Sequence, residues 1–268
     1  MNFWPHIKIS RNENGKIEFV FFGKRQIAIS DFEFYSGNPL IIIASGPSVK
    51  DVNIDFFDSK KFDLLGVNGA YRLSPSVDFK YQVIIDRTFI LNRFEIILDV
   101  LKNKRLTLIT TMDCLNEILR KDCSIEIKCK IIIIDDVEQP VYERKKNLFE
   151  INNINLTIKR NVAFSFDLNK GFYDGCTVAY VALQMAFFLN YKEIYFAGLD
   201  MNNFDKPRFY ESSDDSISTE LNENLDNIII PCFDLSEELA KQNGIMIYNL
   251  SMHSTIDSFE KIEYISVK

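Results

Sequence analysis

The stretch that most suggests chemistry is a short polar loop after a buried run. Residues 38–52 read NPLIIIASGPSVKDV, so an apolar run at 40–44 leads directly into Ser45, Gly46, Pro47 and Ser48. A glycine lets a ligand approach the backbone, and Ser48 with Asp51 three residues later fits the spacing of a capping box at a helix start. Free amides at a helix start suit a phosphate. We therefore predict an anion-binding loop here, with a plain strand-to-helix turn as the alternative.

A second candidate anion site opens an apolar helical stretch. Residues 174–190 read DGCTVAYVALQMAFFLN, in which Asp174 is the expected N-cap. Gly175, Cys176 and Thr177 then form a helix start with little side-chain bulk, where a phosphate could meet bare amides. The alternative is an ordinary buried helix, and the body of this helix is expected to be one in either case.

Polar residues also follow three other strand-like runs. Asn68 follows residues 63–67, Asp86 and Arg87 follow residues 81–85, and Gly198 and Asp200 stand at the end of 193–198. Asn68 and Asp86 could bind a base, a ribose or sugar hydroxyls, or they could cap turns. Arg87 could balance a carboxylate or phosphate, or pair with Asp86. Ligands of parallel sheets bind beyond the carboxyl ends of the strands, which is where these residues are expected.

Several common catalytic patterns are missing. Histidine occurs only at positions 6 and 253, which argues against a His-ligated zinc site, and no GxSxG or DxD motif occurs. Sugar-diphosphate donors commonly need Mg²⁺ for their leaving group, whereas a nucleoside-monophosphate donor can be served by amides and hydroxyls. The sequence therefore fits a metal-free CMP-sugar enzyme with no cofactor better than a UDP-sugar enzyme.

Strand-length apolar runs alternate with helical patterns through most of the chain. The runs are 40–44, 63–67, 81–85, 106–110, 130–135, 193–198 and 245–249, and the helical patterns are 88–103, 112–121, 174–190 and 234–243. Runs that are apolar at every position indicate strands covered on both faces. The pattern predicts an α/β fold of the Rossmann-like kind, with a mainly parallel sheet and helices on both faces.

Three segments fall outside this alternation. Residues 1–36 contain short β-type runs and turns, which predict a small N-terminal β meander, and 37–268 then form the nucleotide-sugar-binding catalytic domain. The polar stretches 136–173 and 201–231 are long for loops. We expect the first to be a lid or an acceptor-facing insertion and the second to be a lid.

Composition sets the class of protein. The chain has 268 residues, 47% of them hydrophobic, and a net charge of −7, which argues against nonspecific nucleic-acid binding. Five cysteines without a CxxC pair, and an N-terminus without the apolar segment of a signal peptide, indicate reduced thiols and a cytoplasmic location. No apolar run reaches membrane-spanning length.

The order and spacing of these motifs resemble a known family. IIIASGPSVKD, GVNGAY, IDRTF, GLDMNNFDKPRFYES, STEL, PCF and IYNLSMHSTI resemble the lipopolysaccharide core Kdo transferase III (WaaZ-type) proteins. They are also similar, at a greater distance, to bacterial CMP-sialic-acid-dependent lipooligosaccharide sialyltransferases. The resemblance covers about residues 40–260 and leaves 1–36 unexplained.

The resemblance implies a Rossmann-like glycosyltransferase that uses a CMP-activated acidic sugar. Ser45, Gly46 and Ser48 would face the phosphate or ribose of CMP, with Asn68 and Asp86 near the donor. Residues 175–177 would meet the donor carboxylate or phosphate, and Gly198, Leu199 and Asp200 would hold cytidine and ribose. Tyr210 matches a tyrosine that aids the leaving phosphate, and Arg208 beside it could add charge.

One departure concerns the general base. The sialyltransferases carry a catalytic histidine before their last helix, and the equivalent region here, 215–230, has none. Glu220 in STEL is the expected substitute, which would take the proton of the acceptor hydroxyl while CMP departs. His253, after the last strand, is the alternative base. A solvent-facing helix acid is the non-catalytic interpretation of Glu220.

The expected activity is therefore transfer of an acidic sugar, Kdo favoured, from a CMP-sugar to a lipopolysaccharide or lipooligosaccharide core acceptor. Sialyl transfer, a pterin-type pyrophosphokinase and a non-catalytic nucleotide- or glycan-binding accessory protein are the alternatives. A lipid-linked acceptor implies peripheral contact with the cytoplasmic face of the inner membrane, and the protein could form a homo-oligomer. Donor, acceptor, linkage and oligomeric state are left open by the sequence.

Overall fold

A large parallel sheet organises the molecule. The computed structural model describes residues 4–13, 15–34 and 37–267, so residues 1–3, 14, 35 and 36 of the predicted meander, and residue 268, lie outside the description. The sheet has eight strands in the order β13-β12-β11-β4-β5-β6-β7-β8, and every neighbouring pair is parallel. The strands are β4 (Leu40–Ile43), β5 (Asp63–Val67), β6 (Tyr81–Ile84), β7 (Thr107–Thr110), β8 (Lys130–Ile133), β11 (Glu193–Ala197), β12 (Met246–Asn249) and β13 (Glu260–Lys261).

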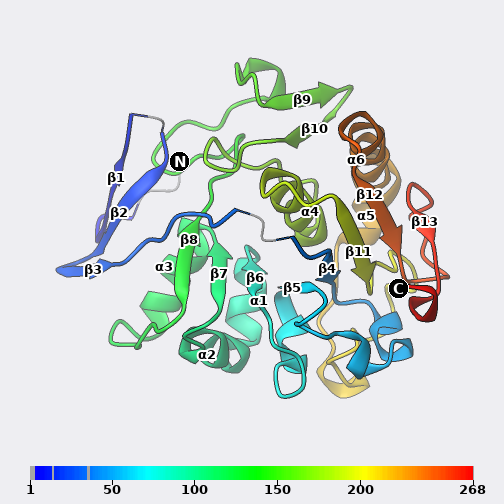
Figure 1. The fold of residues 1–268 in the computed structure, drawn as a ribbon. Helices are drawn as coiled ribbons and strands as arrows, with labels where there is room; N and C mark the ends of the chain where they lie inside the picture. The colour runs from blue at the N-terminus through cyan, green and yellow to red at the C-terminus, as the bar shows by residue number, and fades with distance from the viewer. Residues whose placement is uncertain (1–3, 14, 35–36, 268) are drawn as a thin grey trace.

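Helices cover both faces of this sheet (Figure 1). One face carries α1 (Arg87–Asn92), α2 (Phe94–Lys102) and α3 (Met112–Lys121), and the other carries α4 (Val178–Phe188) and α6 (Ile230–Asn243). The central strands are apolar at nearly every position because both of their faces are covered. The predicted Rossmann-like α/β class is confirmed.

The order of the strands creates one switch point. From β4 the chain builds outward to β8, and it then returns to place β11 on the other side of β4. The loops that leave β4 and β11 therefore turn toward opposite faces of the sheet, and this is where ligands of open α/β sheets bind. The predicted polar loops after both strands meet at this point.

The N-terminal residues form a separate antiparallel sheet. It contains β1 (Ile7–Arg11), β2 (Ile17–Phe22) and β3 (Arg25–Ile27), as the meander prediction requires. The sheet packs beside α3 and the β8 edge, where the His6 ring bonds Asn116 at 2.9 Å and the Ser30 amide donates to the Ile131 carbonyl at 2.7 Å. Its buried side chains join the same apolar cluster as α3. Whether 1–36 counts as a domain of its own stays a proposal.

The stretch 136–173 is more ordered than its polar sequence indicates. It contains a 3₁₀ turn, η4 (Leu148–Glu150), and a hairpin of β9 (Leu156–Lys159) and β10 (Val162–Ser165). The buried Gln184 of α4 accepts from the amides of Ser165 and Tyr173, both at 3.0 Å, and donates to the Tyr173 carbonyl at 2.7 Å. This part of the insertion is thus fixed to α4 rather than free to act as a lid.

The stretch 201–231 divides near residue 220. Up to that point it has only a short 3₁₀ turn, η5 (Ser213–Asp215), and after it α5 (Leu221–Asn224) and the π-helical η6 (Leu225–Ile229) run directly into α6. Leu221, Leu225 and Ile228 pack against the apolar core, which explains why this half is helical. Residues 221–231 are therefore helical, and the role of 201–231 as a lid stays a proposal; the predicted helix at 234–243 begins earlier, at Ile230.

Candidate functional site

The loop after β4 binds a negative group, but the group belongs to the protein. Residues Pro47–Asp51 form a five-residue 3₁₀ turn, η1, instead of an α-helix. The Ser48 amide donates to Asp200 Oδ2 at 2.9 Å, and the Ser48 hydroxyl bonds the other carboxylate oxygen. The buried Asp200 carboxylate thus occupies the position that we expected for a donor phosphate. The capping role expected for Ser48 is also wrong, since Gly46 holds the N-cap position without a side-chain bond.

Gly46 is needed for contact between two loops. Its amide donates to the Gly198 carbonyl at 3.0 Å, and a Cβ at this position would lie 2.5 Å from both that oxygen and Asp200 Oδ2. Gly198 adopts a φ of +78°, and a side chain there would meet Val49 at 2.4 Å. The lack of a side chain at Gly46 thus serves the close approach of the loop after β11, and a contact of Gly46 with a ligand stays a proposal. Ser45, which precedes it, is partly exposed.

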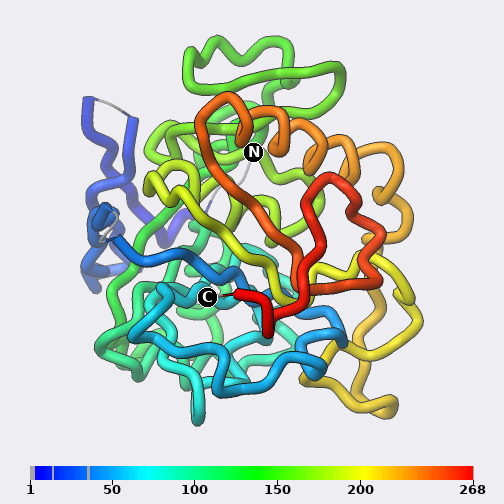
Figure 2. Tube along the Cα trace, turned by 45° about the vertical axis from the view of Figure 1, so that its right-hand side comes forward, coloured from blue at the N-terminus to red at the C-terminus, as the bar shows by residue number. Residues whose placement is uncertain are grey.

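Residues 198–200 join β11 to the loop after β12. Leu199 is fully buried, and its carbonyl accepts from the Asn249 amide group at 3.3 Å and the Ser254 hydroxyl at 2.5 Å. The Ser251 hydroxyl lies 2.7 Å from the Ser48 hydroxyl and accepts from the Gly198 amide at 3.1 Å. Figure 2 shows the chain after β12, in red, running past the yellow 198–210 segment, and the Thr255 amide donates to the Asp200 carbonyl at 2.9 Å.

Three residues of this cluster were not predicted from the sequence: Asn249, Ser251 and Ser254. Their only signal was a group of small polar residues directly after the last long strand. Both carboxylate oxygens of Asp200 and the Leu199 carbonyl already have hydrogen-bond partners within the protein. We therefore interpret this cluster as the structural base of the switch point, and we call it the floor. Its role in holding cytidine and ribose stays a proposal.

Tyr210 lies over the end of β5. Its ring fills the space beside Gly69, where a Cβ would come within 2.0 Å of it, and the Phe209 amide donates to the Ser45 carbonyl at 3.2 Å. Burial raises the pKa of Tyr210 to about 12, while the charge of Arg208 acts in the opposite direction. Among the residues that the structure describes, the Tyr210 hydroxyl has no hydrogen-bond partner. It is therefore a protonated donor near the switch point.

Asn68 also presents an unused polar atom. It adopts a φ of +48° at the start of η3 (Asn68–Leu73), and its carbonyl accepts from Gln82 at 2.9 Å. Its side-chain Oδ1 is buried and has no partner within the described part of the chain. A buried acceptor without a partner is costly, so a donor group brought by a ligand would be favoured there.

Asp86 and Arg87 have local partners. Asp86 is the N-cap of α1 and accepts from the Thr88 amide at 2.8 Å. The Arg87 guanidinium donates to Glu117 of α3 at 2.9 Å, so its partner is Glu117 and not Asp86, which was one of the two alternatives for Arg87. Its role toward a donor anion stays a proposal, with its charge already shared with Glu117.

The second anion candidate begins later than predicted. The α4 helix starts at Val178 with Thr177 at the N-cap, and Gly175 and Cys176 are left-handed at φ +58° and +59°. Asp174 is therefore not the N-cap. Asp174 is exposed, yet the pKa of its carboxyl is raised, mainly by desolvation at this edge and to a smaller extent by the charge of Asp86. The Cys176 amide acts in the opposite direction.

An acidic neighbour, Asp136, belongs to the same edge. Burial is the main cause that raises the pKa of Asp136 to about 7, and the charges of Asp174 and Glu138 raise it further. The Glu138 amide, which donates to Asp136 at 2.8 Å, lowers the pKa. Close carboxylates of this kind favour a proton on one of them near neutral pH.

Replacing Asp136 with asparagine should stabilise the protein only at higher pH. Burial raises the pKa of Asp136 from 3.8 to about 7. The protonated side chain therefore costs the folded state nothing below pH 3.8, and its ionisation lowers the stability of the fold as the pH rises through 7. We expect Asp136→Asn to be close to the wild type at pH 4 and to raise the free energy of unfolding by about 4 kcal/mol at pH 8. Urea unfolding at both values measures this. The exposed Asp205→Asn is the control, and an equal effect of Asp136→Asn at both pH values would contradict the assignment.

The four predicted catalytic residues differ in their exposure and in their bonding partners. Arg208 donates to both oxygens of Glu211, at 3.1 and 3.3 Å, so its charge is neutralised by its neighbour. Glu220 is exposed at the N-cap position of α5 and makes no capping bond. His253 is exposed, and its carbonyl accepts from Asn202. Only Tyr210 is shown directly against the strand ends.

Neither a metal centre nor a membrane span is found in the described chain. Within residues 4–13, 15–34 and 37–267, no group of three or more His, Cys, Asp or Glu side chains is placed to hold a metal ion. No helix there combines the length and the apolar character needed to cross a bilayer. Two surface hollows, one beside Lys16 and Phe34 and one beside His6 and Phe22, include none of the predicted site residues.

The switch-point loops, with Asn68 and Tyr210 at the same edge, define the chain as a Rossmann-like α/β protein with a candidate nucleotide site. The family model described as 3-deoxy-D-manno-octulosonic acid transferase WaaZ matches residues 21–268. The chain belongs to this family of Kdo transferases and is a glycosyltransferase. The resemblance drawn from the short motifs is thereby confirmed.

Two curated relatives carry the name probable 3-deoxy-manno-octulosonic acid transferase. The protein from Salmonella typhimurium is 27% identical over 246 residues, covering 84% of this chain and 86% of its own. The protein from Escherichia coli K12 is 27% identical over 250 residues, covering 85% and 83%. Among solved structures, the α-2,3-sialyltransferase Cst-I from Campylobacter jejuni gives a TM-score of 0.49 at 14% identity, with 90% of this chain and 86% of that chain covered.

Proposed function

We propose that the protein transfers Kdo from CMP-Kdo to a lipopolysaccharide core acceptor without a metal ion. The observation that carries the proposal is Tyr210, whose ring lies over Gly69 at the strand ends of a Kdo transferase family member and whose hydroxyl has no partner among the described residues. The acceptor hydroxyl attacks the anomeric carbon as the bond from that carbon to the phosphate oxygen breaks. The Tyr210 hydroxyl donates to the departing phosphate, where negative charge grows.

The donor position that we propose differs from the first expectation. With the Ser48 amide bonded to Asp200, the phosphate is better served by Tyr210 and by the amides at the start of α4, after Thr177. Asn68 Oδ1 would accept from a donor hydroxyl or amino group, and Asp86 would lie near the sugar. Residues 45–48 and 198–200 would contact the nucleotide from below as the floor of the site.

Release of CMP from two donors tests the proposal. We expect the wild type to release CMP from CMP-Kdo with a core acceptor, to act poorly on CMP-sialic acid, and to keep its rate in EDTA. Faster release from CMP-sialic acid would favour the sialyltransferase alternative. Binding of CMP without turnover of either donor would favour the accessory alternative, and binding of ATP that depends on Mg²⁺ would favour the pyrophosphokinase.

Glu220 is the general base that we propose. Loss of a general base typically costs 10²–10⁴-fold, so Glu220→Gln should lower kcat for CMP-Kdo by about 100-fold. The matched control is Glu223→Gln, an exposed acid on the same short helix, which should change kcat less than about twofold. Full turnover by Glu220→Gln would exclude it, and Asp174, with its raised pKa at the sheet edge, would be tested next, ahead of His253.

The lipid-linked acceptor supports peripheral contact with the cytoplasmic face of a membrane. On the N-terminal side, Phe19 is 46% exposed and Phe34 is 64% exposed, as a surface-contact role would require. Flotation of the protein with lipid vesicles tests this contact, and sedimentation measures whether a homo-oligomer forms.

A further inference from the structure

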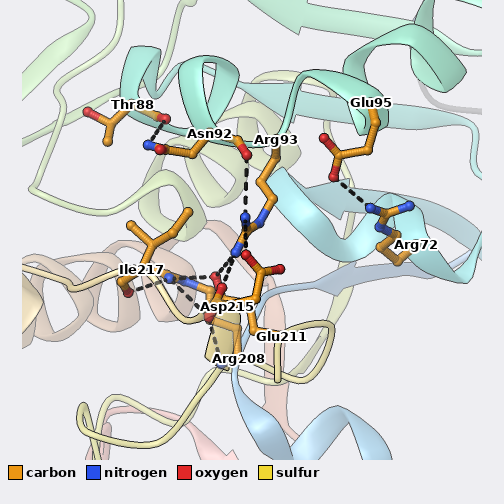
Figure 3. A network of polar contacts seen from close by, with 9 residues as sticks. All are labelled: Arg72, Thr88, Asn92, Arg93, Glu95, Arg208, Glu211, Asp215 and Ile217. Atoms are coloured by element: carbon orange, nitrogen blue, oxygen red, sulfur yellow. Dashed lines mark hydrogen bonds and ion pairs between the residues drawn. The ribbon is translucent and has the colours of Figure 1, made fainter. Parts of the chain in front are cut away.

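A buried acid joins the 201–220 segment to the helical face of the sheet. The side chain of Glu211 is 1% exposed and lies between two arginines (Figure 3). Arg208 donates to its two oxygens at 3.1 and 3.3 Å, and Arg93 donates to Oε1 at 3.3 Å. A buried carboxylate needs such partners, because an unpaired buried charge is strongly unfavourable.

Arg93 comes from a different part of the chain. It stands at the junction of α1 and α2, with a side chain only 9% exposed, and it also donates to Asp215, both to the side chain at 2.9 Å and to the carbonyl. Arg208 donates in addition to the Ile217 carbonyl at 3.0 Å. Arg93 therefore ties residues 208–217, which have almost no regular structure, to the α1–α2 junction, and Arg208 links two points within the segment.

Tyr210 lies inside this network along the chain. It lies between Arg208 and Glu211 in the sequence, its ring packs edge-on against Phe89 of α1 with centroids 6.5 Å apart, and it covers Gly69. The charges of Arg208, Glu211 and Arg93 all act on its hydroxyl. Glu211 directly follows Tyr210 in the chain, so its ion pairs restrain the backbone that carries the Tyr210 ring.

We propose that Glu211 is a positioning residue: paired with Arg93 and Arg208, it holds residues 208–217 against the α1–α2 junction and keeps Tyr210 over Gly69. This inference rests on the proposed role of Tyr210 toward the leaving phosphate. Glu211 itself has both oxygens engaged, so it is not expected to touch substrate.

A double-mutant cycle tests the link to Tyr210. Glu211→Gln keeps the shape of the side chain and removes its charge, and we expect kcat for CMP-Kdo to fall about tenfold with KM changed less than about threefold. In the Tyr210→Phe background, the same substitution should change kcat less than about twofold. The control is Glu95→Gln, which breaks the exposed Arg72–Glu95 pair of 2.6 Å on the neighbouring α2 and should leave kcat unchanged (Figure 3). Equal fold losses in the two backgrounds would overturn the positioning role.

Hydrogen exchange separates this inference from the proposed function. We expect amides of residues 208–217 to exchange faster in Glu211→Gln than in the wild type or Glu95→Gln, whether or not the protein turns over CMP-Kdo. If the amides of residues 208–217 exchanged equally fast in Glu211→Gln and in the wild type, the positioning role of Glu211 would be refuted, even with full transferase activity. If Glu211→Gln does not fold, Arg93→Lys keeps one positive charge but loses the forked geometry, and it should show the same faster exchange.

Discussion

Tyr210→Phe should lower kcat for transfer from CMP-Kdo by about 100-fold and change KM less than about threefold. The hydroxyl has no protein partner among the described residues, so its removal costs no hydrogen bond in the free protein. Its pKa, raised to about 12 by burial, keeps it protonated and able to donate to the leaving phosphate near neutral pH. Steady-state kinetics with a core acceptor measures the effect.

A second tyrosine supplies the control for this prediction. Tyr248 of β12 also has a partly exposed ring, stacked on Tyr195 with centroids 5.3 Å apart. Tyr248→Phe should leave kcat within about twofold of the wild type. A loss in KM alone for Tyr210→Phe would mean that the hydroxyl binds the ground state of the donor, and the leaving-group role would be wrong.

Asp200→Ala should lower the free energy of unfolding by about 3 kcal/mol. The substitution leaves the Ser48 amide and hydroxyl without the carboxylate that accepts from both, and it removes the side-chain part of the contact between the loops after β4 and β11. Hydrogen bonds to charged groups are worth about 1.5–3 kcal/mol each, and a buried donor without a partner is costly. Urea unfolding followed by circular dichroism measures the loss.

The exposed Asp51, at the end of the same 3₁₀ turn, provides the matched control. Asp51→Ala should change the free energy of unfolding by less than about 0.5 kcal/mol. If Asp200→Ala instead kept wild-type stability and only weakened CMP binding, Asp200 would be a donor ligand as first expected, and the floor interpretation would fail.

The strands of the large sheet were predictable because their pattern is local. All seven predicted runs became β4–β8, β11 and β12 within two residues at each end. Continuous apolar runs such as 40–43 have few alternatives to a strand covered on both faces. Only β13, with two residues, lacked such a signal.

Helix starts were less predictable because they depend on tertiary contacts. The DGCT sequence suggests a cap at Asp174, but Gly175 and Cys176 turn left-handed before α4 begins at Val178. Likewise the helical stretch of α5, η6 and α6 begins at residue 221, ahead of the predicted start at 234, because Leu221 and Leu225 pack against the apolar core. Local propensity cannot report which surface a residue will meet.

The sequence by itself determined the class of fold, the family and the edge of the sheet at which chemistry is expected, because strand periodicity and short motifs are encoded in neighbouring residues. Only the tertiary structure decided the partners of the charged groups. The carboxylate on Ser48 is Asp200, 152 positions away, and the acid between Arg93 and Arg208 is Glu211. Such pairings depend on how the chain brings distant loops together, and no local pattern specifies them.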